Sequence, residues 1–283
     1  MGFFLDLAEK KNDDYWYLLQ TRVFEEKLKG AFELLRGEGI EPILIKGWAA
    51  GLFYPEEKKR RYTDIDLCVE PESFERALNL VRSERGSRLG IDLHRGLRNL
   101  DVLPWEDLFG NSRVLKMGDG AIRVLRPEDH LRVLAVHWLV DGGENRERLW
   151  DIFYLVKNRP EGFDWDRCLN SAGEKRRLWV LCTIEVARKH LGLEVGDLPF
   201  AERMPQIPGW MERTLKKEWR SGVPLIPLRY CRGDLPLLFK QIRKRIPPNP
   251  IQATVDLEGD FDEKRRFFYQ LRNFFRRLIV AGR

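Results

Sequence analysis

Two aspartates placed two residues apart are the side chains of this sequence best suited to chemistry. Asp64 and Asp66 lie in the segment Asp64-Ile65-Asp66-Leu67-Cys68-Val69, in which they alternate with apolar residues. Such alternation predicts a β-strand with both carboxylates on one face, about 6.6 Å apart. Mg²⁺ prefers one or two carboxylates together with phosphate oxygens. The pair therefore predicts a metal site, and Asp92, on a further short strand, offers a third acid.

The residues before this strand suggest a phosphate-binding turn. The apolar run Ile43-Leu44-Ile45 predicts a buried strand, and Lys46-Gly47 then leads into a short helix. Glycine lets the backbone approach a phosphate closely, and a helix N-terminus favours anions. Lys46 would act as a point charge on phosphate, and Arg60 could hold two oxygens at once. The alternative for both cations is an ion pair with Asp64 or Asp66.

The surrounding pattern predicts an α/β unit followed by helices. Apolar residues recur at helical spacing from residue 12 to 36, and Pro127 marks the point beyond which every readable segment is helical. We expect an α/β domain with a small mixed sheet at residues 1–126 and an all-helical domain at 127–283. The expected strands are 43–45, 65–69, one around Ile91 and 121–125; the expected helices are 12–36, 48–54, 71–82, 105–109, 128–140, 146–157, 165–170, 174–191 and 260–281.

Composition indicates an ordinary globular protein. The 283 residues are 43% hydrophobic and 33% charged, and no apolar run approaches the roughly 18 residues that span a bilayer. The first residues lack the basic and apolar regions of a signal peptide. The four cysteines show no C-x-x-C spacing, which argues against a zinc site or a disulfide framework. We therefore expect a cytoplasmic protein with no membrane partner.

The charge is unevenly distributed. Residues 201–283 contain 18 Lys and Arg against 9 Asp and Glu, a net charge of +9, whereas the rest of the chain carries −3. Such a basic segment can attract a polyanion, RNA or tRNA above all, through residues such as Lys240, Arg243, Lys244 and Arg245. In the alternative interpretation the cations are a solvated helix face, and the apolar stripe of Phe267, Leu271, Phe274 and Leu278 packs in the core.

The ordered motifs resemble a known family. Lys46-Gly47, Arg60 and Asp64-Ile65-Asp66-Leu67 are followed by Asp92-Leu93-His94, and the likeness continues through residues 125–131, 150–152 and 163–165. Over roughly residues 20–200 the chain resembles the uncharacterised nucleotidyltransferase family, which is related to the polymerase-β fold. The superfamily's usual Gly-Ser is here Gly47-Trp48, and the link from Asp66 to Asp92 is short.

The resemblance implies an activity and a role for each motif residue. It implies transfer of a nucleoside monophosphate from an NTP to an acceptor hydroxyl, with release of pyrophosphate and with one or two Mg²⁺ ions. Asp64, Asp66 and Asp92 would bind metal, and Asp92 would also orient or deprotonate the acceptor hydroxyl. Lys46, Gly47 and Arg60 would bind the NTP. Two alternatives stay open: an RNA- or tRNA-modifying enzyme of a toxin or defence system, and a catalytically silent nucleotide-binding module.

Overall fold

The computed structural model describes residues 2–97, 101–223 and 225–281. The chain divides into two compact units. The first comprises Met1–Val133 and Asn158–Asp164, and the second comprises Leu134–Lys157 and Trp165–Arg283. The division passes through one helix, α6 (Pro127–Val140). The domain boundary predicted at residue 126 stays a prediction, and each unit is described by itself.

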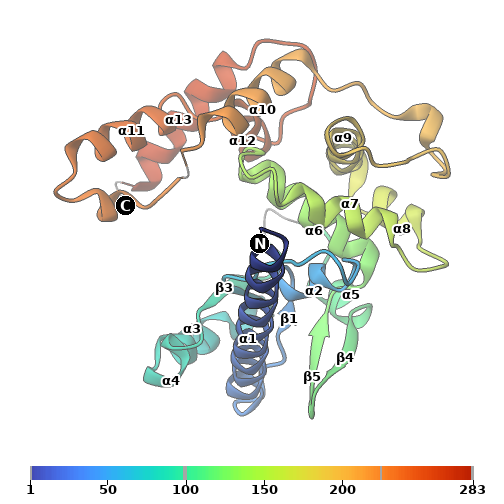
Figure 1. Ribbon diagram of the computed structural model, residues 1–283. Helices are drawn as coiled ribbons and strands as arrows, with labels where there is room; N and C mark the ends of the chain where they lie inside the picture. The colour runs from blue at the N-terminus through green and yellow to red at the C-terminus, as the bar shows by residue number, and fades with distance from the viewer. Residues whose placement is uncertain (1, 98–100, 224, 282–283) are drawn as a thin grey trace. The chain divides into compact units, whose positions relative to one another are not determined.

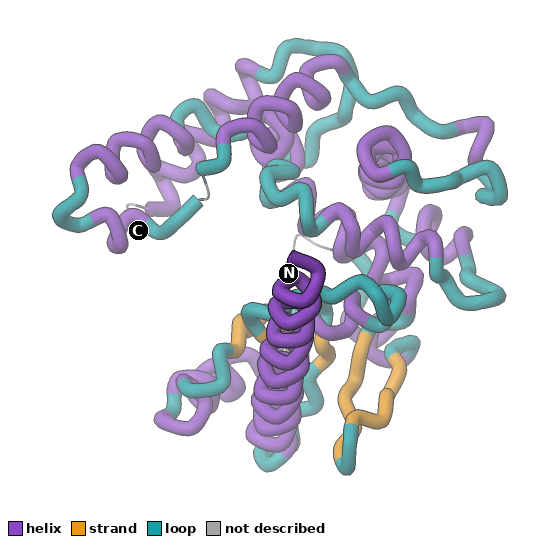
Figure 2. The backbone as a smooth tube through the Cα atoms, in the orientation of Figure 1, coloured by secondary structure: helices purple, strands orange, loops and turns teal. Residues whose placement is uncertain are grey.

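The first unit contains a five-stranded mixed sheet with the order β3-β2-β1-β5-β4. The pairs β2–β3 and β1–β5 are parallel, whereas β1–β2 and β4–β5 are antiparallel. Figure 2 shows these strands in orange among purple helices. The strands are β1 (Ile43–Leu44), β2 (Ile65–Val69), β3 (Ile91–Arg95), β4 (Arg113–Met117) and β5 (Gly120–Val124). The predicted fold class, a small mixed sheet with helices followed by a helical part, is confirmed.

Helix α1 (Gly2–Arg36) covers one face of this sheet, as Figure 1 shows. The apolar positions of its C-terminal half recur every three or four residues, so they form one stripe that faces the strands. The stripe consists of Phe24, Leu28, Ala31, Phe32 and Leu35. It packs against Ile65, Leu67 and Val69 of β2 and against Leu44, Ile122 and Val124 of the neighbouring strands. Because strand side chains alternate, the face that carries Asp66 points away from this core.

The connection from β2 to β3 runs through helices. It contains a 3₁₀ turn (Pro71–Ser73), α3 (Phe74–Arg82) and the single turn α4 (Glu84–Ser87). Ala77 of α3 is fully buried in the core of the sheet. Ser83 caps α4 by accepting a hydrogen bond from the backbone N–H of Gly86. Such a crossover lets β3 return parallel to β2.

The second unit is helical. Its core includes Trp179, Val180, Ile184 and Ala187 of α9, all fully buried. The helices after α6 are α7 (Leu149–Lys157), α8 (Trp165–Asn170), α9 (Gly173–Leu191), α10 (Gly209–Ser221), α11 (Leu235–Arg245), α12 (Pro250–Asp256) and α13 (Phe267–Ala281), with 3₁₀ turns at Ala201–Arg203 and Leu228–Cys231. No helix of the described residues is both long and apolar enough to pass through a bilayer.

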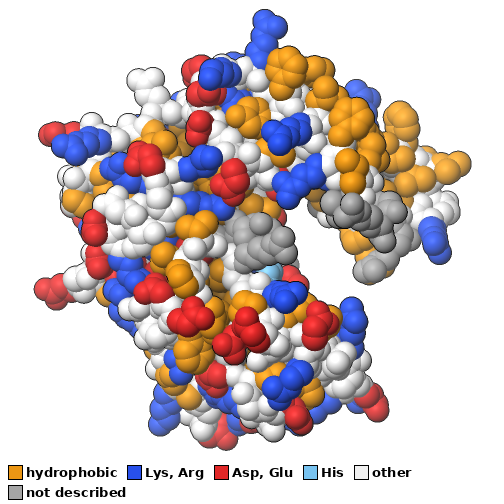
Figure 3. Space-filling view, turned by 180° about the vertical axis from the view of Figure 1, so that it is seen from behind, with side chains coloured by type: hydrophobic (Ala, Val, Ile, Leu, Met, Phe, Trp, Pro, Cys, Tyr) orange, Lys and Arg blue, Asp and Glu red, His pale blue; other side chains and the backbone are white. Residues whose placement is uncertain are grey.

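The expectation that the C-terminal apolar stripe packs in the core is wrong. Phe267, Leu271 and Leu278 are exposed, Phe274 is only partly buried, and the neighbouring Phe268 is 76% exposed. The inward face of α13 instead carries Asn273, whose amide donates to a carboxylate oxygen of Asp256 at 2.8 Å. The apolar side thus points outward, and Figure 3 shows hydrophobic side chains gathered over α11 and α13 with Lys and Arg among them.

Helix α13 also begins later than the predicted residue 260. The buried guanidinium of Arg266 donates to the backbone carbonyls of Asp260, Asp262 and Lys264. Three carbonyls that accept from one side chain are held in a loop conformation rather than in a helical ladder.

Candidate functional site

Asp66 and Asp92 are direct neighbours in the sheet. The parallel pairing of β2 with β3 places Asp66 opposite Asp92 and Cys68 opposite His94. Residues opposite each other in a sheet point to the same face, so the two carboxylates stand side by side. Asp66 is buried, whereas the Asp92 side chain is 57% exposed. One carboxylate is therefore anchored in the protein, and the other meets solvent.

His94 completes a cluster with these two acids. Its Nε2 lies 3.5 Å from Oδ1 of Asp66 and 3.5 Å from Oδ2 of Asp92. One ligand atom from each of the three side chains falls within 4.8 Å of the others. His94 shares the face of Asp92 because it lies two residues further along β3. That spacing is visible in the sequence as Asp92-Leu93-His94, although no metal contact was predicted for His94.

Lys46 forms an ion pair with Asp66. Its Nζ lies 2.5 Å from Oδ1 of Asp66, and both side chains are almost completely buried. This is the alternative that the sequence left open for Lys46. A carboxylate oxygen has two lone pairs, so Oδ1 can bind a further cation beside the Lys46 ammonium.

The cluster shifts the pKa of each of its members. Burial lowers the pKa of His94, but hydrogen bonds to Asp66 and Asp92 outweigh it and raise that pKa to about 9. Burial raises the pKa of Asp66, yet the contacts with His94 and Lys46 bring it below its usual value. The pKa of Asp92 is lowered mainly by His94. Two ionised carboxylates are therefore balanced by two cations at neutral pH.

The donor set is suited to a hard divalent cation. Asp66 and Asp92 supply carboxylate oxygens, which Mg²⁺ prefers, and one oxygen of each lies within the group. The imidazole of His94 is a better ligand for softer metals. The two carboxylates thus fit Mg²⁺, with His94 and Lys46 as the cations that balance them in the metal-free protein.

The other predicted metal ligand lies just outside this arrangement. Asp64 precedes β2, is exposed, and accepts a hydrogen bond from the Thr63 hydroxyl at 2.7 Å. The group of described acids and histidines whose ligand atoms come together does not include it. A metal role for Asp64 stays a prediction, because an exposed side chain at the end of a strand can reorient.

The predicted phosphate-binding residues are placed as follows. Gly47 precedes α2 (Trp48–Gly51) with φ of 64° and ψ of −118°, a conformation that is open to glycine and strained for other residues. The buried Arg60 donates to the carbonyl of Arg61 at 3.5 Å, and its guanidinium lies 5.5 Å from the centre of the Tyr62 ring. Their contact with phosphate stays a prediction.

Trp48, which replaces the usual serine, connects α2 to α1. Its indole N–H donates to a carboxylate oxygen of Glu25 at 3.0 Å, and its ring packs against the core of the sheet. The residue after Gly47 therefore anchors the turn instead of offering a hydroxyl.

A comparison with known families decides the membership of the chain. The family described as uncharacterised nucleotidyltransferase matches residues 15–191, which include both strands of the cluster and the Lys-Gly turn. The chain belongs to this family. No curated protein and no solved structure matches it. Membership supports nucleotidyl transfer in general, and it leaves the donor, the acceptor and the metal to be determined.

Other residues in which the sequence resembles the family build the scaffold of the first unit. The buried carboxylate of Glu128 accepts from Arg126 Nε at 2.8 Å and from the backbone N–H of Asp164 at 2.9 Å. Arg132 is buried between Asp101 and Asp129. These contacts hold residues 158–164 and the first turns of α6 on the first unit.

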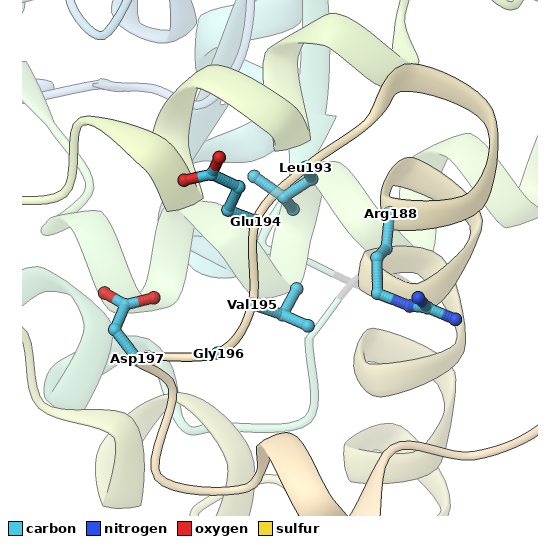
Figure 4. Close-up of a pocket in the computed structure, with 6 residues that line it drawn as sticks. All are labelled: Arg188, Leu193, Glu194, Val195, Gly196 and Asp197. Carbon is cyan, nitrogen blue, oxygen red and sulfur yellow. The ribbon is translucent and has the colours of Figure 1, made fainter.

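The cavities described here lie at other residues. One of about 490 Å³ is lined by Arg188 of α9 and by residues 193–197. Figure 4 shows that the carboxylates of Glu194 and Asp197 point away from Arg188. The guanidinium of Arg188 is already held by both carboxylate oxygens of Glu185. A smaller cavity of about 280 Å³ adjoins Arg95 and Gly96 at the end of β3.

Proposed function

We propose that the protein transfers a nucleoside monophosphate from an NTP to an acceptor hydroxyl, in a Mg²⁺-dependent reaction that releases pyrophosphate. The observation that carries the proposal is the in-register pairing of Asp66 with Asp92, in a member of a nucleotidyltransferase family. Two carboxylates side by side on one face of a sheet are what a metal-dependent phosphoryl-type transfer requires.

Each residue of the cluster has a role that follows from its burial. Asp66 and Asp92 would hold the ion, which supplies electrostatic stabilisation of the charge that develops on the phosphate oxygens. Asp92, the exposed member, meets solvent and could also accept the proton of the acceptor hydroxyl. Lys46 contributes a positive charge next to Asp66. Gly47 and Arg60 would bind phosphate, and Asp64 would add a carboxylate from the end of β2.

A label-transfer experiment tests the proposal. The protein is incubated with each α-labelled NTP, MgCl₂ and separate fractions of RNA, protein and small molecules. We expect label to enter one fraction, with pyrophosphate released, and EDTA to stop the reaction. Because the acids act as a unit, Asp66→Asn and Asp92→Asn should each lower the rate by at least about 100-fold.

Asp119→Asn is a matched control. Asp119 is an exposed carboxylate of the same unit, in the turn between β4 and β5, and it pairs with Lys29. Transfer by this variant should equal that of the wild type. Wild-type rates in both Asp66→Asn and Asp92→Asn would overturn the assignment. Mg²⁺-dependent NTP binding without transfer in any fraction would favour a silent binding module.

A further inference from the structure

The second unit contains a cavity of about 410 Å³ next to helices α10 and α11. Such a volume is within the range of small-molecule sites. Its walls combine side chains of the two helices with the segment 247–250 and with Gln270 of α13. The charged residues that line it are Lys217, Glu218, Lys240, Arg243 and Lys244.

The charges of the lining do not cancel. Lys244 lies 3.6 Å from Glu218 and 3.0 Å from Glu144, and it donates to the backbone carbonyl of Val223. Lys244 is therefore paired within the protein, and its ammonium group neutralises the carboxylate of Glu218.

The other three cations of the lining, Lys217, Lys240 and Arg243, are exposed and have no carboxylate partner within the described parts of the chain. Three cations around one cavity, without acids of their own, attract a multiply charged anion.

Another part of the lining is apolar and held in place. It consists of Val223, Pro247, Pro248 and Pro250. The Gln270 side chain donates to the carbonyl of Pro248 at 2.7 Å. Asn249 accepts from the backbone N–H of Ile251 at 2.9 Å and donates to the carbonyl of Gly142 at 3.1 Å. A proline wall offers no backbone N–H donors, so it favours an uncharged ring over a second anionic group.

We propose that this cavity binds the phosphate groups of an organic ligand, with Lys217, Lys240 and Arg243 as the phosphate contacts and the proline wall against a sugar or base. Phosphate satisfies the cations better than a single carboxylate because it carries more charge, and because its oxygens match the fork of an Arg. The phosphates can belong to a free nucleotide or to a strand of RNA. The site does not depend on the proposed transfer reaction.

Binding measurements with a triple variant test the site. The probes are inorganic tripolyphosphate, adenosine 5′-monophosphate and a 12-nucleotide single-stranded RNA, measured by isothermal titration calorimetry in EDTA so that metal at Asp66 and Asp92 plays no part. We expect the combined substitutions Lys217→Gln, Lys240→Gln and Arg243→Gln to lower the affinity of the protein for at least one probe by about tenfold or more. If RNA is the probe affected, the slope of log K against the logarithm of the salt concentration should become shallower by about 2 in the triple variant.

A second triple variant separates a built site from general attraction to a basic unit. Arg213→Gln, Arg220→Gln and Arg232→Gln remove the same charge from exposed positions that do not line the cavity. Its affinity for the affected probe should stay within about twofold of the wild type. Weaker binding of AMP by the first triple variant identifies the ligand of the cavity as a free phosphorylated molecule. Weaker binding of RNA alone identifies it as a nucleic acid. Equal behaviour of both triple variants with all three probes would overturn the proposal.

Discussion

At the scale of single residues, the cluster on β2 and β3 is an arrangement of balanced charge. Asp66 contacts Lys46 and His94, and the side chains of Asp66, Lys46 and His94 are 3%, 8% and 26% exposed. Loss of one partner of a buried ion pair leaves an uncompensated charge in a medium that solvates it poorly. The stability and the chemistry of the site therefore depend on the same carboxylate.

Asp66→Asn should destabilise the protein as well as inactivate it. The substitution leaves the Lys46 ammonium and the His94 imidazolium close together without their common partner, at a cost on the order of 3 kcal/mol. The free energy of unfolding is measured by urea titration at pH 7. Adding Lys46→Met should recover most of that loss without restoring nucleotidyl transfer. Recovery of transfer in the double variant would mean that Asp66 acts only through its ion pair.

Sequence reasoning reached these residues by different routes. The alternation in residues 64–69 located β2 at its observed bounds, and Asp92 was predicted as a third acid on a further strand, whereas His94 was given no metal role. The register that pairs Asp66 with Asp92 is a long-range property of two strands, and no local pattern encodes it. The ion pair of Lys46 with Asp66 depends on the same fold, so the sequence left it as one of two alternatives.

At the scale of elements, local signals predicted some segments and not others. Strand β4 was not predicted because it is a short edge strand whose side chains, Met117 excepted, are at least partly exposed, so it lacks an apolar pattern. The prolines between residues 199 and 250 obscured α10 to α12. Two of these helices carry recognisable starts: Asp234 caps α11 and Asn249 caps α12, each followed by proline in the first turn.

His190, in the last turn of helix α9, should make the stability of the protein depend on pH. Burial lowers the pKa of His190, whose ring meets that of Trp219 edge-on at 4.9 Å. The charged groups around it are Glu212, which raises the pKa, and Lys189, Arg146 and Lys216, which lower it. The unfolded state binds the proton more tightly, so this contribution to stability is present above about pH 6.5 and is lost as the pH falls below it.

Replacing His190 isolates this contribution. His190→Phe keeps an aromatic ring against Trp219 and removes the titration. Between pH 7.5 and pH 5, its free energy of unfolding in urea should fall less steeply than that of the wild type. Parallel curves for the two proteins would show that His190 titrates equally in the folded and unfolded states.

At the scale of the whole molecule, the fold class followed from the sequence, but the side of α13 that faces inward did not. Hydrophobic periodicity shows that a helix has an apolar face, and it does not show that the protein covers that face. Here the inner position is taken by Asn273 because Asp256 of α12 offers it a partner. The orientation of α13 therefore follows the polar contact between α12 and α13 rather than the apolar periodicity of its sequence.

The exposed side of α13 should tolerate polar residues. Phe268→Gln and Ile279→Gln remove side chains that are 76% and 63% exposed. The free energy of unfolding should change by less than about 0.5 kcal/mol for each. Light scattering at high protein concentration should show less self-association, because a contiguous apolar patch is removed. A loss of 2 kcal/mol or more would mean that these side chains are packed in the native protein.

The in-register pairing of β2 with β3 also determines which insertions and deletions the first unit can accept during evolution. Residues 70–90 connect the two strands, and their number does not enter the pairing of Asp66 with Asp92. That connection can lengthen or shorten while the carboxylates stay opposite each other, so its short length here carries no information about activity. A single residue inserted between Ile91 and Asp92 would instead turn the aspartate toward the core under α1. Length variation among homologues should therefore concentrate in the connection and be absent from the two strands.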